Sequence, residues 1–235
     1  MKKGELYEKD DRILADAMHT LKNMITPIIA YSEMIQYGHV EPEKIPEVAK
    51  KIGFCASNVT QMCTELVEIY RLRGNLVNKA VEKIFPYEVL QECLYLIESS
   101  LNPKKIKLVN RLDKSVAVLF NFGMLRSVFM KLINNSIKFS PEGSTIDISG
   151  EIVDEDTYEI SVKDEGVGID EDKIEEKLRN NTDYSTPGLQ NETGTGLGLL
   201  LVKIVLDKHQ GTLRAYNNKD KGCTFVFTLP LYKEN

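Results

Sequence analysis

The sequence predicts an α+β protein in two parts, an N-terminal helical hairpin followed by an α/β sandwich. From about Leu6 to Leu72, apolar residues recur every three or four positions, which is the period of a buried helical face. Beyond about Val81, short strand-like runs alternate with helical stretches. The chain has 235 residues, of which 42% are hydrophobic and 28% charged, as in a soluble globular protein. We expect two domains, at 1–78 and 79–235.

The first part reads as two amphipathic helices of roughly 30 residues, joined by the loop YGHVEPEKIP. Each helix has one predicted buried face, formed by Ile13, Leu14, Ala17, Leu21, Met24, Ile28, Tyr31 and Ile35 in the first and by Ile45, Val48, Ile52, Cys55, Val59, Met62, Leu66 and Ile69 in the second. Two helices alone bury little apolar surface. We therefore expect the hairpin to pair with a second copy into a dimeric four-helix bundle.

The second part mixes helices with several consecutive strands, which indicates a sandwich with helices on one face of a sheet. Helices are predicted at 86–101, 124–139 and 196–209, and strands at 105–112, 116–120, 145–153, 157–164, 211–217 and 223–231.

Composition excludes several classes of protein. The net charge of −5 gives no general argument for binding nucleic acid or an anionic membrane. The longest apolar run, GLGLLLVKIVL, is shorter than the ~20 residues that span a bilayer, and the charged N-terminus does not resemble a signal peptide. The four cysteines (Cys55, Cys63, Cys93 and Cys223) form no metal-binding pattern, so reduced thiols are expected. We expect a cytoplasmic protein without direct contact to nucleic acid or membrane.

Three short motifs in the second part point to nucleotide chemistry. The sequence DEGVG at 164–168 ends a predicted strand, and GTGLGL at 194–199 directly precedes a predicted helix. Upstream, the helix SVFMKLINNSIKF is followed by Ser-Pro. Each motif alone is an ordinary turn or helix end, but the ordered set at element boundaries is hard to obtain by accident. The set is neither a P-loop nor a GxGxxG fingerprint.

Each motif offers a suitable group. Glycines before a helix let backbone N–H groups approach phosphate oxygens at the positive end of the helix dipole. Asp164 can accept a hydrogen bond from an exocyclic amine. Asn135 carries an amide oxygen of the kind that Mg²⁺ prefers, and Lys138, three positions on, shares its helix face and can contact phosphate.

These motifs resemble those of the sensor histidine kinases: LINNSIKFSP is similar to their N box, DEGVG to their G1 box and GTGLGL to their G2 box. The resemblance extends over about 19–231, and the three motifs are specific for the wider ATP-binding group that includes gyrase. It implies a Bergerat-type sandwich that binds ATP and Mg²⁺. Asn135 would hold Mg²⁺, Lys138 would contact phosphate and Asp164 would bind the adenine amine. Residues 180–192 would form a mobile lid, and the pocket would be lined by Gly166, Gly168, Gly194, Thr195, Gly196, Leu197 and Gly198.

The resemblance also implies a phosphate-accepting histidine early on the first helix, in a motif H-E-x-x-T/N-P. Two alignments compete. Thr26-Pro27 would place Lys22 at the histidine position, whereas His19 would place Asn23 at the Thr/Asn position. Family members often carry a Tyr-small-Glu run at a set distance after the histidine, and Tyr31-Ser32-Glu33 lies at that distance from His19. His19 is therefore the predicted acceptor, since a neutral imidazole has a nucleophilic nitrogen.

Some positions depart from the family pattern. Thr20 stands where an acidic residue usually takes the imidazole proton, and Lys131 stands where a neutral or acidic residue is usual. Glu175 and Leu178 replace the two aromatics before the lid. These changes argue against fast autophosphorylation, whereas Asn23, one turn after the acceptor, suits the positioning of water that dephosphorylates a receiver.

The leading interpretation is a dimeric histidine kinase core that phosphorylates His19 and passes phosphate to, or removes it from, an Asp of a response-regulator receiver. The first alternative is a weak or inactive pseudokinase whose nucleotide sets the conformation of the hairpin. The second is an ATPase clamp of the gyrase type. His39 is expected to be solvated and His209 structural. Because His19 stands close to the first residue, the sensor input is expected from a longer parent chain or from a partner.

Overall fold

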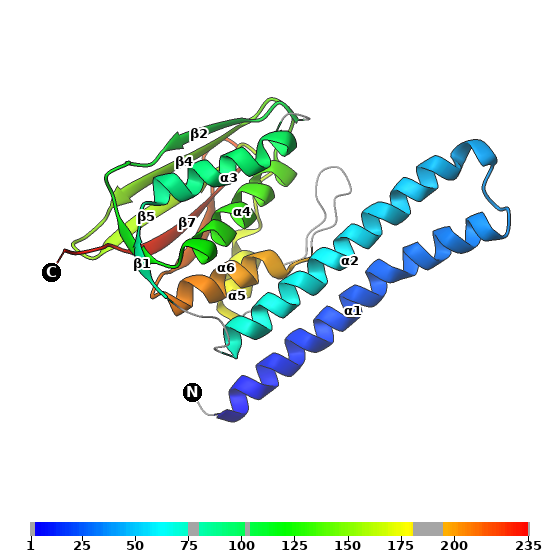
Figure 1. Ribbon diagram of the computed structural model, residues 1–235, viewed down its shortest axis with the longest axis horizontal. Coiled ribbons are helices and arrows are strands. Elements are labelled where there is room, and N and C mark those ends of the chain that lie inside the picture. Colours follow the sequence, from blue (N-terminus) through cyan, green and yellow to red (C-terminus); the bar gives the residue numbers. More distant parts are fainter. Residues whose placement is uncertain (1–2, 75–79, 102–103, 181–194, 235) are drawn as a thin grey trace.

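The computed structural model describes residues 3–74, 80–101, 104–180 and 195–234, with side chains except at 3–14, 16, 99–101 and 176–180. A long helical hairpin lies beside an α/β sandwich (Figure 1). The predicted fold class is therefore confirmed. The predicted boundary between residues 78 and 79 falls among residues outside the described ranges and stays a prediction.

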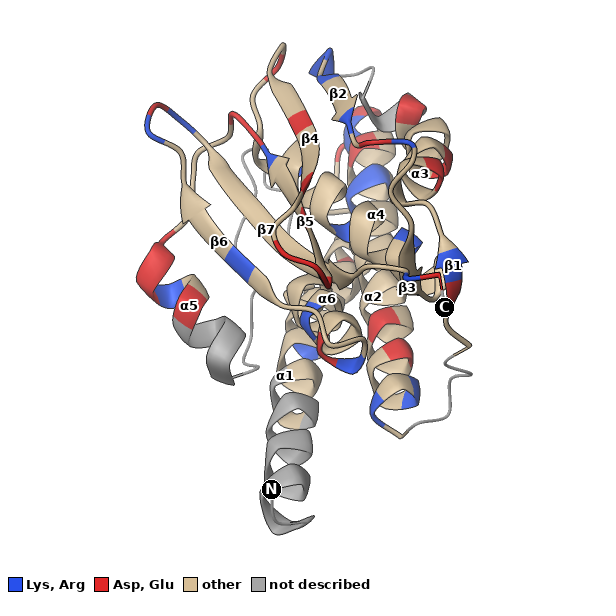
Figure 2. Ribbon diagram, turned by 90° about the vertical axis from the view of Figure 1, so that its left-hand side faces the viewer, with Lys and Arg blue, Asp and Glu red and all other residues tan. Residues whose placement is uncertain are grey.

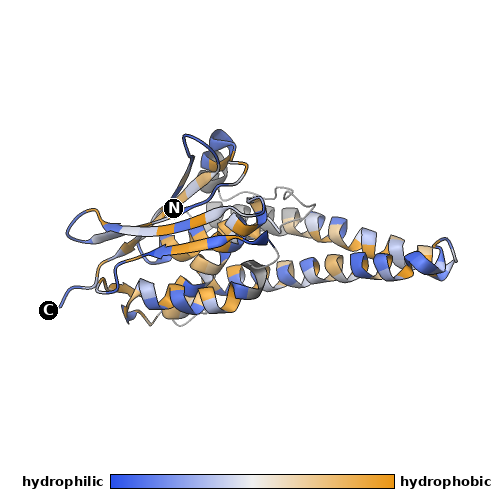
Figure 3. Ribbon diagram, turned by 90° about the horizontal axis from the view of Figure 1, so that it is seen from above, coloured by the Kyte–Doolittle hydropathy of each residue, from blue (hydrophilic) through white to orange (hydrophobic). Residues whose placement is uncertain are grey.

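The hairpin consists of α1 (Lys3–Gln36), a 3-10 turn η1 (Pro42–Lys44) and α2 (Ile45–Arg73). Among the described side chains, those of the predicted inner faces are the less exposed ones, except Ile45 at 36%, and Ala17, Met62 and Ile69 are almost completely buried. Ile13 and Leu14 lie outside the described side chains. Helix α1 continues past Pro27. Because proline has no N–H, the Asn23 carbonyl loses its usual intrahelical donor. Hydrophobic and hydrophilic positions alternate along both helices (Figure 3).

The sandwich is built on a five-stranded sheet with the order β2-β4-β5-β7-β6, in which β2 and β4 are parallel and the other described pairs antiparallel. Its strands are β2 (Lys107–Arg111), β4 (Thr145–Ile152), β5 (Thr157–Lys163), β7 (Cys223–Pro230) and β6 (Leu213–Asn217). A smaller antiparallel pair joins β1 (Glu82–Ile84) and β3 (Val118–Phe120). Helices α3 (Pro86–Leu101), α4 (Phe122–Phe139) and α6 (Leu197–Lys208) cover one face of the sheet (Figure 1).

Two elements were not predicted from the sequence. Strand β1 is only three residues long, too short to show a period. Helix α5 (Glu171–Asn180) contacts β6 and is polar at all but two positions, Ile174 and Leu178, which are too few to predict a helix.

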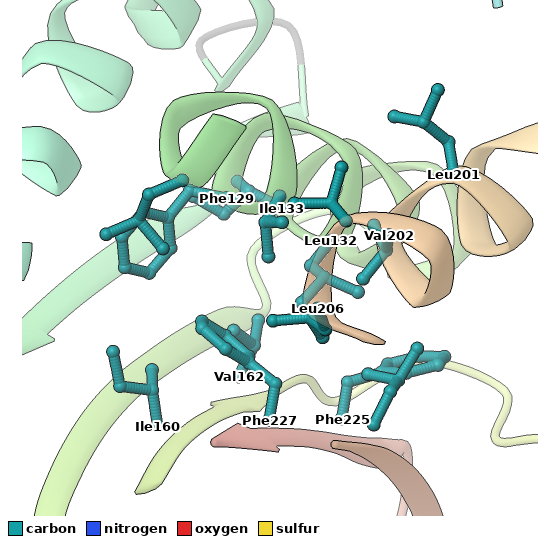
Figure 4. Packing of buried hydrophobic residues seen from close by; sticks show 14 of the residues in the cluster. Phe129, Leu132, Ile133, Ile160, Val162, Leu201, Val202, Leu206, Phe225 and Phe227 are labelled. Atoms are coloured by element: carbon teal, nitrogen blue, oxygen red, sulfur yellow. The ribbon is translucent and has the colours of Figure 1, made fainter. Parts of the chain in front are cut away.

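The core lies between the sheet and the helices (Figure 4). Phe129 and Leu132 of α4 and Leu206 of α6 meet Val162 of β5 and Phe227 of β7, and all of these side chains are almost completely buried. The rings of Phe129 and Phe227 meet edge to face, with centroids 5.7 Å apart. This packing fixes α4 and α6, whose ends carry two of the three predicted nucleotide motifs.

The opposite face of the sheet is polar, because side chains alternate between the faces of each strand. Two ion pairs link neighbouring or nearby strands there. Arg111 of β2 contacts Asp147 of β4 at 2.8 Å, and Arg214 of β6 contacts Glu159 of β5 at 2.8 and 2.9 Å.

The hairpin also packs against the sandwich, through α2 and α6 (Figure 1). Met62, Ile69 and Leu72 of α2 belong to the same buried cluster as Leu197 and Leu201 of α6. The structure thus has one continuous core rather than two separate ones. Among the described helices, none is long and apolar enough to cross a membrane.

Candidate functional site

The Asp164 carboxylate forms the most constrained part of the site. It follows β5, is only 2% exposed, and accepts hydrogen bonds from three parts of the chain. Oδ1 accepts the N–H groups of Gly166 at 2.9 Å and Cys223 at 3.1 Å. Oδ2 accepts the Ser136 hydroxyl at 3.2 Å and the Cys223 thiol at 3.3 Å. These four donors fix the carboxylate, and the two on Oδ2 are the weaker and more adjustable pair.

The turn after Asp164 requires glycine at two positions. A Cβ on Gly166 would lie 2.6 Å from the carbonyl oxygen of Phe139, at the end of α4. Gly168 has a φ of +78°, and a Cβ there would lie 2.6 Å from the Asn217 side-chain oxygen. Val167 N–H also donates to the Phe139 carbonyl, at 3.3 Å. Gly166 therefore lets the turn pack directly against the end of α4, and Gly168 lets it approach the Asn217 side chain.

Both ends of α4 are capped by side chains. Asn121 accepts the Met124 N–H at its start, and the buried Lys104 ammonium donates to the carbonyls of Ile137 and Lys138 at 2.9 and 3.1 Å. Sequence reasoning missed Lys104, because nothing local to it marks a cap of a distant helix.

The predicted Mg²⁺ and phosphate residues lie near this end of α4. Asn135 and Lys138 are both half-buried, and the Lys138 ammonium lies 4.9 Å from the centre of the Phe139 ring. Asn135 supplies one amide oxygen. Among the residues that the structure describes, no group of three His, Cys, Asp or Glu could hold a metal ion. A Mg²⁺ ion at Asn135 would therefore take its other ligands from phosphate and water, which is its common mode of binding.

The glycine motif before α6 shapes the start of that helix. Gly196 precedes α6 with a φ of +74°, and Thr195, which is buried, accepts the Leu197 N–H on its hydroxyl at 3.3 Å. Among the described residues, a Cβ on Gly198 would meet one atom, Glu65 Oε1, at 4.0 Å, so the first turn of α6 is open on that side. Gly194 and the predicted lid at 180–192 lie outside the described residues, except for Asn180, which is the last residue of α5.

Glu65 of α2 was not predicted as a site residue, yet it reaches this turn. Its side chain is buried, and its carboxylate accepts hydrogen bonds from Thr195 Oγ1, from Gln61 Nε2 at 3.2 Å and from Lys131 Nζ at 2.9 Å. In the sequence, the unusual Lys131 indicated this contact, but the sequence did not show which acidic residue is its counterion. The structure identifies Glu65 as that counterion, so the cation of α4 is compensated.

The predicted acceptor, His19, is exposed on α1 and takes no part in the contacts described above. Its Nδ1 lies 3.3 Å from Nδ2 of Asn23, which is also exposed, and Thr20 is half-buried. The contact leaves Nε2 as the outward nitrogen. The tautomer depends on the Asn23 amide, since its oxygen would accept an Nδ1 proton and leave the Nε2 lone pair available, whereas its nitrogen would favour the opposite tautomer.

The other histidines fit the roles expected for them. His39 is exposed in the hairpin loop. His209 is buried, its Nδ1 lies 2.8 Å from the Val205 carbonyl, and its ring stacks on Phe120 at 4.0 Å. The thiol of Cys223, beside Asp164, is buried, and this burial raises its pKa well above the ordinary value.

A buried carboxylate followed by a glycine turn, on a mixed sheet covered by helices on one face, is the arrangement expected of a Bergerat-type nucleotide-binding domain. Residues 123–233 match the family described as "Histidine kinase-, DNA gyrase B-, and HSP90-like ATPase". The similarity continues over the hairpin in the sensor-like histidine kinase SenX3 of Mycolicibacterium smegmatis, 25% identical over 94% of this chain and 57% of that protein. The chain therefore carries a domain of this ATPase family, and over nearly its whole length it is similar to sensor histidine kinases.

Other comparisons agree. Sporulation kinase E of Bacillus subtilis is 24% identical over 98% of this chain and 30% of its own length. The chain thus spans about half, or less, of these curated relatives. Among solved structures, the histidine kinase ThkA in complex with the response regulator protein TrrA matches 98% of this chain and 64% of that chain, with a TM-score of 0.77 and 21% identity. The Acinetobacter baumannii histidine kinase AdeS matches 92% and 98%, with a TM-score of 0.71 and 22% identity.

Proposed function

We propose that this chain is an ATP-dependent autokinase that phosphorylates His19 and exchanges the phosphate with an Asp of a response-regulator receiver. One observation carries the proposal. A single chain holds both the four-donor Asp164 carboxylate of a Bergerat domain and an exposed imidazole on a helical hairpin. The similarity to ThkA, solved with a response regulator protein, supports a receiver as the partner.

In this proposal, Asp164 Oδ2 accepts a hydrogen bond from the adenine amine. Rotation of the Ser136 hydroxyl away from Oδ2 frees the lone pair that this bond requires. The N-terminus of α6 and Lys138 bind phosphate oxygens. A Mg²⁺ ion bound at Asn135 would neutralise part of the phosphate charge. The chemistry of these groups fits a nucleotide, because the carboxylate can accept a hydrogen bond from the adenine amine, and the backbone N–H groups and the ammonium can donate to phosphate oxygens.

At the acceptor, the Nε2 lone pair of His19 attacks the γ-phosphorus, a P–N bond forms, and the bond to the ADP oxygen breaks. The attack requires the proton to be on Nδ1, where the Asn23 amide oxygen can accept it. Thr20 cannot take a proton from the imidazolium near neutral pH, so solvent has to do so. We therefore expect autophosphorylation to be slow.

The position of His19 along the hairpin supports transfer from the sandwich. His19 lies as far from the C-terminal end of α1 as the buried Met62 lies from the N-terminal start of α2. At ~1.5 Å of rise per residue, both stand about 26 Å from the loop, so the acceptor is at the level where α2 meets α6.

Dimerisation through the hairpin is also part of the proposal. Met18, Ile25 and Ile29 of α1 remain 59%, 39% and 53% exposed, at spacings of seven and four positions that keep them on one side of the helix. Phe54 and Tyr70 of α2 are also exposed. A second hairpin would cover this apolar surface in a four-helix bundle. A monomer found by analytical ultracentrifugation at micromolar concentration would contradict it.

The test of the kinase is incubation with [γ-³²P]ATP. We expect an acid-labile, alkali-stable label that is absent from His19→Gln and present in the matched control His39→Gln. Nucleotide binding without label would favour the pseudokinase, and hydrolysis insensitive to His19→Gln would favour the ATPase clamp.

Removal of phosphate from the receiver is tested separately. A phosphorylated receiver should lose phosphate faster with the wild-type chain than with Asn23→Ala. Equal rates of decay with both proteins and with buffer alone would remove the role given to Asn23.

A further inference from the structure

The environment of the Glu65 carboxylate is one that suits a phosphate group. An ammonium from Lys131, a hydroxyl from Thr195 and an amide N–H from Gln61 all donate to it. Ammonium and hydroxyl groups are standard donors to phosphate oxygens, and charge-assisted bonds of this kind are the stronger ones. The groups that donate hydrogen bonds to the Glu65 carboxylate could therefore donate equally well to another anion.

The carboxylate also lies at the start of α6. Gly196, the N-cap, has no side chain, so the Leu197 N–H donates to Thr195 Oγ1 instead. A Cβ on Gly198 would lie 4.0 Å from Glu65 Oε1. The first turn of a helix favours a negative charge, through its unpaired N–H groups and the helix dipole. In the proposed function, this same turn binds the nucleotide phosphates.

The contact joins the hairpin to the sandwich. Glu65 belongs to α2, whereas Lys131 belongs to α4, one turn before Asn135 on the same side of the helix. One turn on along α2 and one turn back along α4, the Ser127 hydroxyl lies 3.4 Å from Glu68 Oε1. Acidic positions on α2 and basic positions on α4 are visible in Figure 2.

Solvent reaches the ion pair from one side. A groove of about 430 Å³, lined by residues with polar or charged side chains, follows α2 from Ser57 to Glu68, and both Glu65 and Lys131 line it. The Lys131 side chain is 17% exposed, against 5% for Glu65. An incoming phosphate therefore has a route to the cation without unfolding either helix.

We propose that Glu65 is an internal competitor of the nucleotide phosphates: its carboxylate occupies their position at the start of α6, and nucleotide binding displaces it and loosens α2 from the sandwich. The inference rests on the proposed nucleotide site. Two anions cannot share Thr195 and Lys131, because like charges within a few ångströms repel. Once released from Glu65, the Lys131 ammonium pairs with phosphate, which gives this unusual N-box cation a role in binding.

Calorimetric titration of the full chain with ATP and with adenosine tests this competition. Glu65→Gln keeps the shape of the side chain and removes its charge. It should bind ATP about tenfold more tightly than the wild type, as expected when a competing state populated to roughly 90% is removed. Adenosine has no phosphate, so its affinity should stay unchanged. Glu68→Gln makes the same change one turn away, where the carboxylate faces Ser127 instead, and should alter ATP affinity less than about twofold.

The outcomes separate this inference from the proposed function. Adenosine binding together with equal ATP affinity in wild type and Glu65→Gln would overturn the role of Glu65 and leave the nucleotide site intact. Failure of ATP and adenosine to bind any variant would overturn both. If circular dichroism shows that Glu65→Gln does not fold, Glu65→Asp gives the same test. Its carboxylate is drawn back by one methylene, so ATP should bind a few-fold more tightly, and unchanged affinity would refute the inference.

Discussion

Replacing Asp164 by Asn probes the centre of the site with almost no change in shape. Oδ1 would remain with the N–H groups of Gly166 and Cys223, because only an oxygen can accept them. The new NH₂ group would then stand where Oδ2 now accepts the Ser136 hydroxyl and the Cys223 thiol. The variant thus turns the acceptor offered to a nucleotide base into a donor.

The size of the effect follows from these bonds. A hydrogen bond to a charged group contributes about 1.5–3 kcal/mol, whereas a neutral bond contributes about 0.5–1.5 kcal/mol. Losing the bond from the adenine amine should therefore weaken ATP binding by roughly 10- to 150-fold. The free energy of unfolding should fall less, by about 1–2 kcal/mol, because removing a buried charge offsets part of the weakening of the two backbone bonds.

Inosine triphosphate makes the assay specific. Its base carries a carbonyl oxygen where adenine carries the amine, so the NH₂ of Asp164→Asn can donate to it. We expect the ratio of ATP to ITP affinity, measured by calorimetry, to fall at least about tenfold in the variant. Asp147→Asn is the matched control, because it makes the same change on strand β4, at a partly exposed ion pair with Arg111. This variant should lower the free energy of unfolding by less than about 1 kcal/mol.

An unchanged ATP to ITP ratio in Asp164→Asn would refute this interpretation of the carboxylate. If both nucleotides bind more weakly at that unchanged ratio, the variant disturbs the pocket rather than the contact with the base.

Three further predictions concern the frame of the site. Gly166→Ala should lower the free energy of unfolding by about 1–3 kcal/mol in urea titrations and weaken ATP binding, since its Cβ would lie 2.6 Å from the Phe139 carbonyl oxygen. Lys104→Met should lower the free energy of unfolding, measured in the same titrations, by about 1–3 kcal/mol, because two carbonyls at the end of α4 lose a charged donor. Burial raises the pKa of the Cys93 thiol to about 12, so iodoacetamide at pH 8 should modify the exposed Cys63 and leave Cys93 unmodified until the chain unfolds. Since the unfolded thiol ionises near pH ~8.5, stability should fall as pH rises from there towards 12.

Much of the fold was predictable because long periodic segments carry their own signal. The predicted helix at 86–101 matches α3, and α6 starts and ends within one position of the prediction. Strand β1 and helix α5 were missed because one is too short and the other too polar to show a pattern.

The site was predictable only where its residues lie within a motif. Asp164, Gly166 and Ser136 belong to two motifs that were recognised from the sequence. Cys223, by contrast, is 59 positions from Asp164, and Glu65 is 130 positions from Thr195. Such partners are brought together by tertiary packing, and local sequence patterns could flag only the unusual residue, Lys131, at one end of the contact.

The ion pairs on the open face of the sheet have a consequence for association between molecules. Sheets join through flat apolar faces or through unpaired edge strands, and charged residues discourage both. Arg111 and Arg214 lie on β2 and β6, which are the two edge strands of the five-stranded sheet. In concentrated solution, copies of this chain should therefore avoid sheet-to-sheet aggregation, and the apolar positions of the hairpin remain as the surface through which they can adhere.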